Sequence, residues 1–133
     1  KEAASDSSNV SNIIDKINIM KHSINNDWFK TQAFLIAGDY YSDELKLNLA
    51  LKEYKNATQY AQSNAQKGYS NYKLGNVYFE LKEFDKALNS FQKADTFFNL
   101  SKKSSAIDRN QQFTSWADRN SIALYKVKNI LKK

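Results

Sequence analysis

The sequence predicts an all-α protein of helical hairpin repeats, with about six helices and a capping helix at the C-terminal end. The 133-residue chain has no proline and only three glycines. In an average protein roughly 5% of residues are proline and roughly 7% are glycine. Chains rich in turns and strands need these two residues. Apolar residues recur at steps of three and four, which is the spacing of one helix face.

Two segments of the chain repeat the same pattern around a glycine. Gly38 and Gly75 lie 37 residues apart, and a small, an aromatic and a small residue follow each at offsets of 12, 16 and 19. These residues are Ala50, Tyr54 and Ala57 in the first copy, and Ala87, Phe91 and Ala94 in the second. Glycine inside a helix costs roughly 1 kcal/mol relative to alanine. The repeated glycines therefore predict close contact between helices in stacked hairpins.

The N-terminal part predicts a tail, one helix and the first hairpin. Residues 1–9 are small and polar, which is typical of a disordered tail or linker. Apolar residues at steps of three and four from Val10 predict a helix to about Ile24. Asp27 is a good N-cap for a helix over about 28–42. The inward residues of that helix are Phe34, Ala37, Gly38 and Tyr41, and a tight connection leads to a helix over about 47–62.

The rest of the domain, taken as 10–133, predicts a second hairpin and the capping helix. We expect a loop at 64–68, then helices over about 69–81 and 85–98, joined by a turn at Lys82 and Glu83. The hairpins thus span about 28–62 and 69–98. A polar break at 101–105 precedes the capping helix at about 105–132, where helical spacing continues from Phe113 to Leu131.

The excess positive charge lies at the C-terminal end of the chain. The net charge is +6, yet residues 1–100 carry 12 lysines against 12 acidic residues. A candidate basic patch consists of Lys126, Lys128, Lys132 and Lys133. Lysines on a solvated terminal helix explain this pattern, and an acidic protein, an anionic membrane surface or nucleic acid is the alternative partner.

The composition also argues against several function classes. There is no cysteine, and the single histidine, His22, has no partners at metal-ligand spacing. The chain has no glycine-rich phosphate loop and no nucleophile paired with a histidine. We therefore expect no enzyme activity, no cofactor, no metal and no small-molecule substrate.

The first residue and the amino-acid bias bear on the origin of the chain. No apolar run is long enough to span a membrane. The chain begins with Lys, so we expect a fragment of a longer protein whose anchor or signal lies upstream. The frequent Lys, Asn and Ile are typical of AT-rich genomes such as those of spirochaetes. These features favour a bacterial cell-envelope protein over a cytoplasmic one.

Residues 69–98, and less closely 32–61, resemble the tetratricopeptide repeat family. The family pattern is W-x2-L-G-x2-Y, then A-x3-F, then A. Leu74, Gly75 and Tyr78 match the first helix of that pattern, and Ala87, Phe91 and Ala94 match the second. The chain departs from it in the 37-residue period, against about 34 in the family, in Asn71 where Trp is usual, and in the missing proline.

The resemblance implies a groove, lined by the first helix of each hairpin, that binds a peptide or helix. In the second copy the groove residues would be Tyr69, Tyr72, Asn76, Phe79 and Glu80. In the first copy they would be Gln32, Leu35, Asp39, Ser42 and Asp43. The alternative is that the C-terminal helix folds back and covers the aromatic residues.

The same resemblance implies a partner protein for this chain. Some members of the family bind a C-terminal carboxylate through Lys and Asn residues on the first helices. Here only Asn76 matches that set, because Leu35 and Asp39 occupy two of the other positions. The acidic residues nearby favour a helix or strand with apolar anchors and Lys or Arg neighbours. The sequence thus predicts an adaptor module that binds a partner protein, with a membrane surface or nucleic acid at the basic helix as the alternative.

Overall fold

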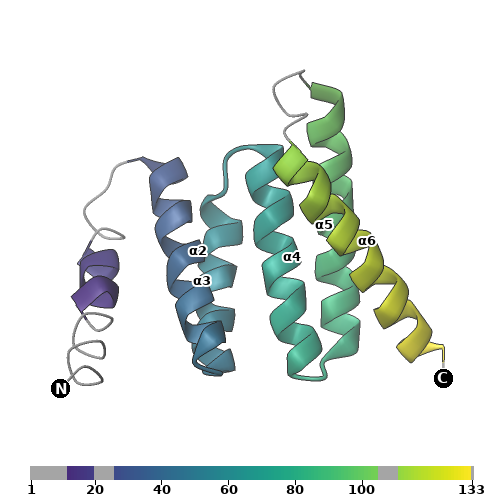
Figure 1. Ribbon diagram of the computed structural model, residues 1–133, viewed down its shortest axis with the longest axis horizontal. Coiled ribbons are helices and arrows are strands. Elements are labelled where there is room, and N and C mark those ends of the chain that lie inside the picture. Colours follow the sequence, from purple (N-terminus) through teal and green to yellow (C-terminus); the bar gives the residue numbers. More distant parts are fainter. Residues whose placement is uncertain (1–11, 20–25, 105–110, 133) are drawn as a thin grey trace.

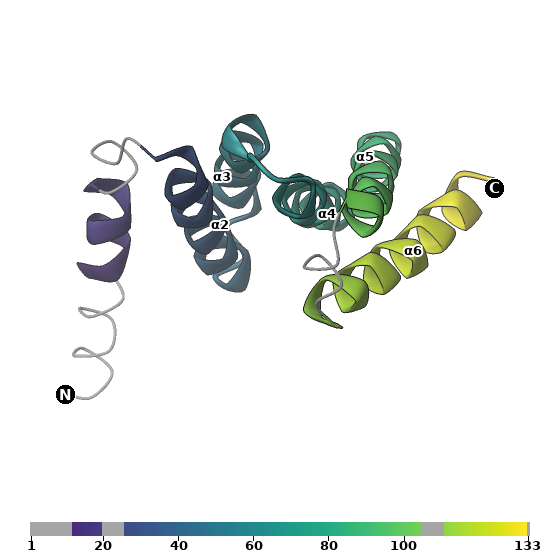
Figure 2. The ribbon, with the colours of Figure 1, turned by 90° about the horizontal axis from the view of Figure 1, so that it is seen from above.

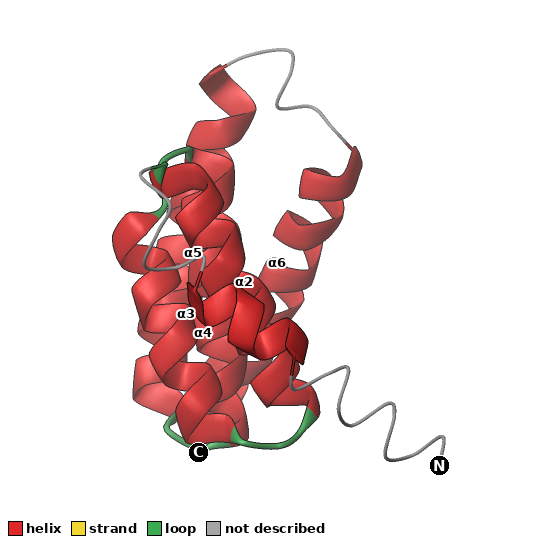
Figure 3. Ribbon diagram, turned by 90° about the vertical axis from the view of Figure 1, so that its left-hand side faces the viewer, coloured by secondary structure: helices red, strands yellow, loops and turns green. Residues whose placement is uncertain are grey.

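The computed structural model describes residues 12–19, 26–104 and 111–132, and this part of the chain forms six helices and no strand (Figures 1 and 3). The all-α fold class is confirmed. The tail expected at 1–9 lies outside the described residues. After a helix over 12–19 come α2 (Asp27–Asp43), α3 (Leu47–Tyr60), α4 (Asn64–Glu80), α5 (Phe84–Ser104) and α6 (Gln111–Leu131).

The helices pair into two hairpins, α2 with α3 and α4 with α5, whose turns are equivalent. In each turn three successive backbone N–H groups bond to carbonyls of the last helical turn, and every donor and acceptor of the first turn recurs 37 residues later. Lys46 N bonds to Tyr41 O at 2.8 Å, and Glu83 N bonds to Tyr78 O at 2.9 Å. These bonds form Schellman motifs, so both turns end their first helix in the same way.

The glycine of each hairpin lies against an aromatic ring of the second helix, as the sequence predicts. A Cβ on Gly75 would lie 2.6 Å from Cδ1 of Phe91, and one on Gly38 would overlap the ring of Tyr54. Both rings are almost fully buried. Only a residue without a side chain lets the two helices approach this closely, so the repeated glycines determine the hairpin packing.

The starts of α2 and α4 differ from the sequence prediction. Asn26, not Asp27, caps α2, because its side chain accepts hydrogen bonds from the N–H groups of Trp28 and Phe29. The loop expected at 64–68 is also wrong, since α4 begins at Asn64. Ser63 Oγ accepts from the N–H of Gln66 at 3.0 Å, which satisfies a free donor of the first helical turn.

The end of α5 differs from the prediction for a related reason. The helix continues to Ser104, beyond the start of the polar break expected at 101–105. Phe98 packs against Gly68, which lies in the first turns of α4 where the loop was expected, and both residues are buried. The longer start of α4 and the longer end of α5 thus form one additional layer of packing.

Two further helices cover the ends of the hairpin array. Helix 12–19 packs through Ile17 against Ala33 and Ala37 of α2. Helix α6 runs obliquely past the other end (Figure 2), packs mainly on α5 and also reaches α4. Asn120 of α6 is fully buried and donates a hydrogen bond to the backbone oxygen of Phe91 at 2.9 Å. The capping role expected for this helix agrees with these contacts.

Candidate functional site: two hollows beside helix α4

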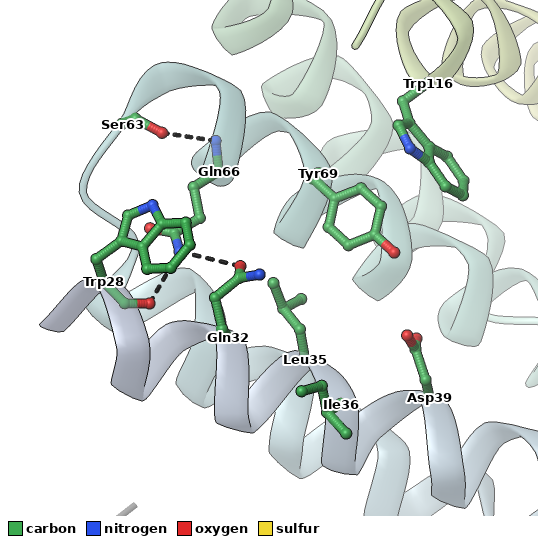
Figure 4. Close-up of a pocket in the computed structure, with 9 residues that line it drawn as sticks. All are labelled: Trp28, Gln32, Leu35, Ile36, Asp39, Ser63, Gln66, Tyr69 and Trp116. Carbon is green, nitrogen blue, oxygen red and sulfur yellow. Dashed lines mark hydrogen bonds between the residues drawn. The ribbon is translucent and has the colours of Figure 1, made fainter. Parts of the chain in front are cut away.

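An aromatic hollow lies between α2, α4 and the start of α6 (Figure 4). Its volume is about 310 Å³, near the lower limit of roughly 300 Å³ for ligand pockets. We call it the aromatic groove, and its lining residues are Trp28, Gln32, Leu35, Ile36, Asp39, Ser63, Gln66, Tyr69 and Trp116. The α2 residues recur over three helical turns, so the groove follows the helix axis.

One end of the aromatic groove is built on the buried side chain of Gln66. Its Nε2 donates to the backbone oxygen of Trp28 at 3.1 Å and to Oε1 of Gln32 at 3.2 Å, while its Oε1 accepts from the N–H of Gln62 at 3.0 Å. This amide joins the first turns of α2 and α4. It therefore fixes the backbone at Trp28, whose side chain is 45% exposed at the mouth of the groove.

The opposite wall of the groove is an aromatic pair from two helices. The rings of Tyr69 and Trp116 meet edge to face at 4.9 Å, which is a favoured aromatic geometry. Lys73 Nζ lies 5.2 Å and the guanidinium of Arg119 lies 4.5 Å from the centre of the Trp116 ring. Burial raises the pKa of Tyr69 above its ordinary value, and the two cations give this aromatic wall positive charge.

Asp39 at the other end of the groove already has two partners. Its Oδ1 accepts a 2.5 Å hydrogen bond from the hydroxyl of Tyr54 and lies 3.4 Å from Nζ of Lys73. Burial, and then the hydrogen bond to Asp39, raise the pKa of Tyr54. The lysine compensates the carboxylate, so Asp39 does not give the groove the free acidic charge that the sequence suggested.

The predicted groove residues divide between separate places. Leu35, Asp39 and Tyr69 line the aromatic groove, whereas Tyr72 is buried beneath the Trp116 ring, whose centre is 5.6 Å away. For Tyr72 the structure thus matches the alternative in which the C-terminal helix covers the aromatic residues. Asp43 is exposed at the end of α2 and lines a smaller polar hollow with Asp39.

The remaining predicted groove residues line a second hollow, which we call the α4–α6 hollow. It also has a volume of about 310 Å³. Its lining residues are Tyr72, Asn76, Phe79, Glu80, Phe91, Arg119, Ile122, Ala123 and Lys126. Helix α6 therefore does not fill the whole face of α4 but leaves an opening on each side of the contact at Trp116.

The predicted basic patch does not form one surface. Lys126 lines the α4–α6 hollow, and Lys128 follows two residues later on the same helix. Two residues on an α-helix are turned by about 200° relative to each other, so these lysines point to opposite flanks of α6. Lys132 is exposed, and Lys133 lies outside the described residues.

Several lining residues were missed by the sequence analysis. Trp28, Ile36 and Arg119 carry no repeat signal, and Trp116 has only the helical spacing of the capping helix. The Ser63-x-x-Gln66 pattern is a known helix-start signal and could have placed α4 correctly. Arg119 could not have been found in this way, because its position depends on how α6 crosses α4.

The described residues contain neither a cluster of metal ligands nor a helix that could span a membrane. Among them, no group of three or more His, Asp or Glu side chains could hold a metal ion. In the same part of the chain, no helix is both long and apolar enough to cross a bilayer. No protein-family model, no curated protein and no solved structure matches this chain.

Proposed function

We propose that this chain is a protein–protein interaction module with two tetratricopeptide-type hairpins, an adaptor in a larger bacterial protein of the cell envelope. The equivalent turns, and the equivalent glycine contacts at Gly38 and Gly75, support the family assignment. The absence of any motif for a reactive group or phosphate in the sequence favours a non-catalytic role. The function of the module is then to present a surface to a partner protein.

The observation that carries this proposal is the exposed apolar lining of the aromatic groove. Trp28 is 45% and Ile36 is 52% exposed, and both flank the opening in front of Tyr69 and Trp116. Large aromatic side chains at a groove supply most of the binding energy in protein interfaces. A helix of the partner with apolar anchors fits a groove that follows α2 for three turns.

The proposal is tested by affinity capture from a lysate of the parent organism at low and high salt. One protein partner is expected to stay bound at high salt, because apolar anchoring is little screened. Trp28→Ala with Ile36→Ala should abolish its capture. The matched control, Leu49→Ala with Leu100→Ala, removes two similarly exposed apolar side chains from α3 and α5 and should leave capture intact.

Other outcomes of this capture experiment separate the alternatives. Retention of nucleic acid or lipid at low salt only would contradict the proposal and move the function to the basic residues of α6. Equal loss in both double variants would contradict the role of the groove. With a partner in hand, its thermal transition and that of this chain should both rise on mixing, because a ligand that binds only the folded state stabilises it.

A further inference from the structure

We infer that the α4–α6 hollow is a second docking site, and that its occupant is an acidic amphipathic helix of a protein partner. This goes beyond the proposed function, which uses the aromatic groove on the other side of Trp116. It also reverses the charge of the partner that the sequence suggested. The inference rests on what α6 contributes to the hollow.

The α6 wall has one cation on each side of an apolar side chain. Arg119, Ile122 and Lys126 follow one another at steps of three and four, so they share a helix face, and all three are exposed. The two cations are seven residues apart, which is about 10.5 Å along the helix axis. A partner helix with carboxylates seven residues apart and an apolar residue between them has the complementary pattern.

The α4 wall completes the apolar part of the hollow and gives it a direction. Phe79 is held edge to face against Phe84, with ring centres 5.3 Å apart. Glu80 is the one acidic residue in the described lining, against two cations on α6. Carboxylates of a partner helix are repelled by Glu80 and attracted by α6, so its acidic face should turn toward α6.

The size and charge distribution of the hollow favour a protein helix over a nucleic acid. A hollow of about 310 Å³ holds one or two large side chains of a partner helix rather than the helix itself. Ile122 is 57% exposed in the middle of the cationic wall, where a phosphate backbone would gain nothing from it. Lys128 points to the other flank of α6 and cannot join the same contact.

The test measures the binding of a designed peptide by fluorescence anisotropy at physiological salt. The peptide is an amidated amphipathic helix with a Leu stripe flanked by Glu at seven-residue spacing, and its counterparts carry Gln or Lys in place of Glu. We expect only the Glu peptide to bind. Arg119→Gln with Lys126→Gln should weaken binding at least about tenfold, as expected for loss of two complementary charges.

The matched control removes the same charge from the other flank of α6. Lys128→Gln with Lys132→Gln should change binding by less than about twofold, because distant exposed charges are screened. Ile122→Ala should also weaken binding, and Trp28→Ala with Ile36→Ala should not, which separates this site from the aromatic groove. Since Arg119 also contacts Trp116, Lys126→Gln alone serves as the test if the double variant loses its fold.

Three results would overturn the inference. Equal weakening of peptide binding in Arg119→Gln with Lys126→Gln and in Lys128→Gln with Lys132→Gln would mean that only the net charge of the chain attracts the peptide. Tighter binding of a single-stranded DNA of matched charge, lost in the Arg119→Gln with Lys126→Gln variant, would assign the site to nucleic acid. Concentration-dependent self-association, removed by the same variant, would identify a second copy of this chain as the occupant.

Discussion

In the α2–α3 hairpin the ring that packs on the glycine carries a hydroxyl, and in the α4–α5 hairpin it does not. Tyr54 lies on Gly38 and donates to Asp39, whereas the equivalent Phe91 lies on Gly75, and both Phe91 and the equivalent Asn76 line the α4–α6 hollow. The turns of the two hairpins have the same backbone hydrogen bonds. The polar groups beside the two rings differ, and they determine what covers each hairpin.

The difference extends to the neighbours of each ring. In the first hairpin Asp39 is also an ion-pair partner of Lys73, so the polar contact links α2 and α3 to α4. In the second hairpin Phe91 receives α6, because its backbone oxygen accepts from the buried Asn120. The first ring thus joins the two hairpins through a polar network, whereas in the second hairpin the backbone of Phe91, not its ring, bonds to the capping helix.

Removal of the Phe91 ring should have the largest effect on stability. Phe91→Ala should lower the free energy of unfolding by about 3–5 kcal/mol, because it leaves a cavity between α4, α5 and α6. Chemical denaturation followed by circular dichroism measures this. Phe29→Ala removes a ring that is 55% exposed and should cost less than about 1 kcal/mol. Similar losses in the two variants would contradict the central place of Phe91 in the core.

Filling the glycine positions should have a smaller effect in both hairpins. Gly38→Ala and Gly75→Ala gain about 1 kcal/mol of helix propensity but place a methyl group within contact of the Tyr54 or Phe91 ring. Overpacking of this kind typically costs about 1–3 kcal/mol, so we expect a net loss of up to about 2 kcal/mol. A rise in the thermal midpoint of either variant would mean that its helices are less tightly packed.

The repeated contacts could be predicted from the sequence because they are local in the hairpin. Glycine, alanine and aromatic residues at this fixed spacing let two neighbouring helices pack closely, with the aromatic ring of one against the glycine of the other. Phe91 packs on Gly75 in this way. Helix starts were less predictable. Asn26 and Asp27 are both good caps, and only the backbone conformation decides that Asn26 is used.

The candidate sites depended on information that no local pattern contains. Tyr72 has the spacing of an exposed groove residue, yet Trp116 from α6 covers it. Lys73 could not be recognised as the partner of Asp39, because the two residues belong to different hairpins. Contacts between hairpins depend on how the hairpins stack and how α6 crosses them, and the repeat pattern specifies neither.

The hydroxyl of Tyr54 should be worth less than the Phe91 ring. Tyr54→Phe makes the first hairpin resemble the second and should cost about 1.5–3 kcal/mol, the range for a hydrogen bond to a charged acceptor. The pKa of Tyr54 is raised in the folded state from an ordinary value of 10.0. The stabilisation is therefore fully present below pH 10 and is lost as the pH rises above it. Urea unfolding of the two proteins between pH 7 and 11 should show the difference shrinking above pH 10.

The smallest expected effects are at the two turns, where the hairpins are most alike. Leu45 and Lys82 have φ angles of 59° and 62°, in the left-handed region that favours glycine at this position of a Schellman motif. Both side chains are exposed, so Leu45→Gly and Lys82→Gly remove strain without removing core packing. Relief of the left-handed conformation is worth about 1–2 kcal/mol, and the greater entropy of glycine in the unfolded chain offsets part of it. We therefore expect each substitution to raise the free energy of unfolding by about 0.5–1 kcal/mol.

The two turn variants give the most direct comparison of the hairpins. Since every hydrogen bond of one turn recurs in the other, the two stabilisations should agree within about 0.5 kcal/mol and add in the double variant. Lys52→Gly, on the exposed side of α3, is the control and should destabilise by about 1 kcal/mol, because helical residues gain nothing from glycine. If Leu45→Gly instead reduced binding of the captured partner without loss of stability, the exposed leucine would belong to the interface, and the hairpins would differ in function even where their backbones coincide.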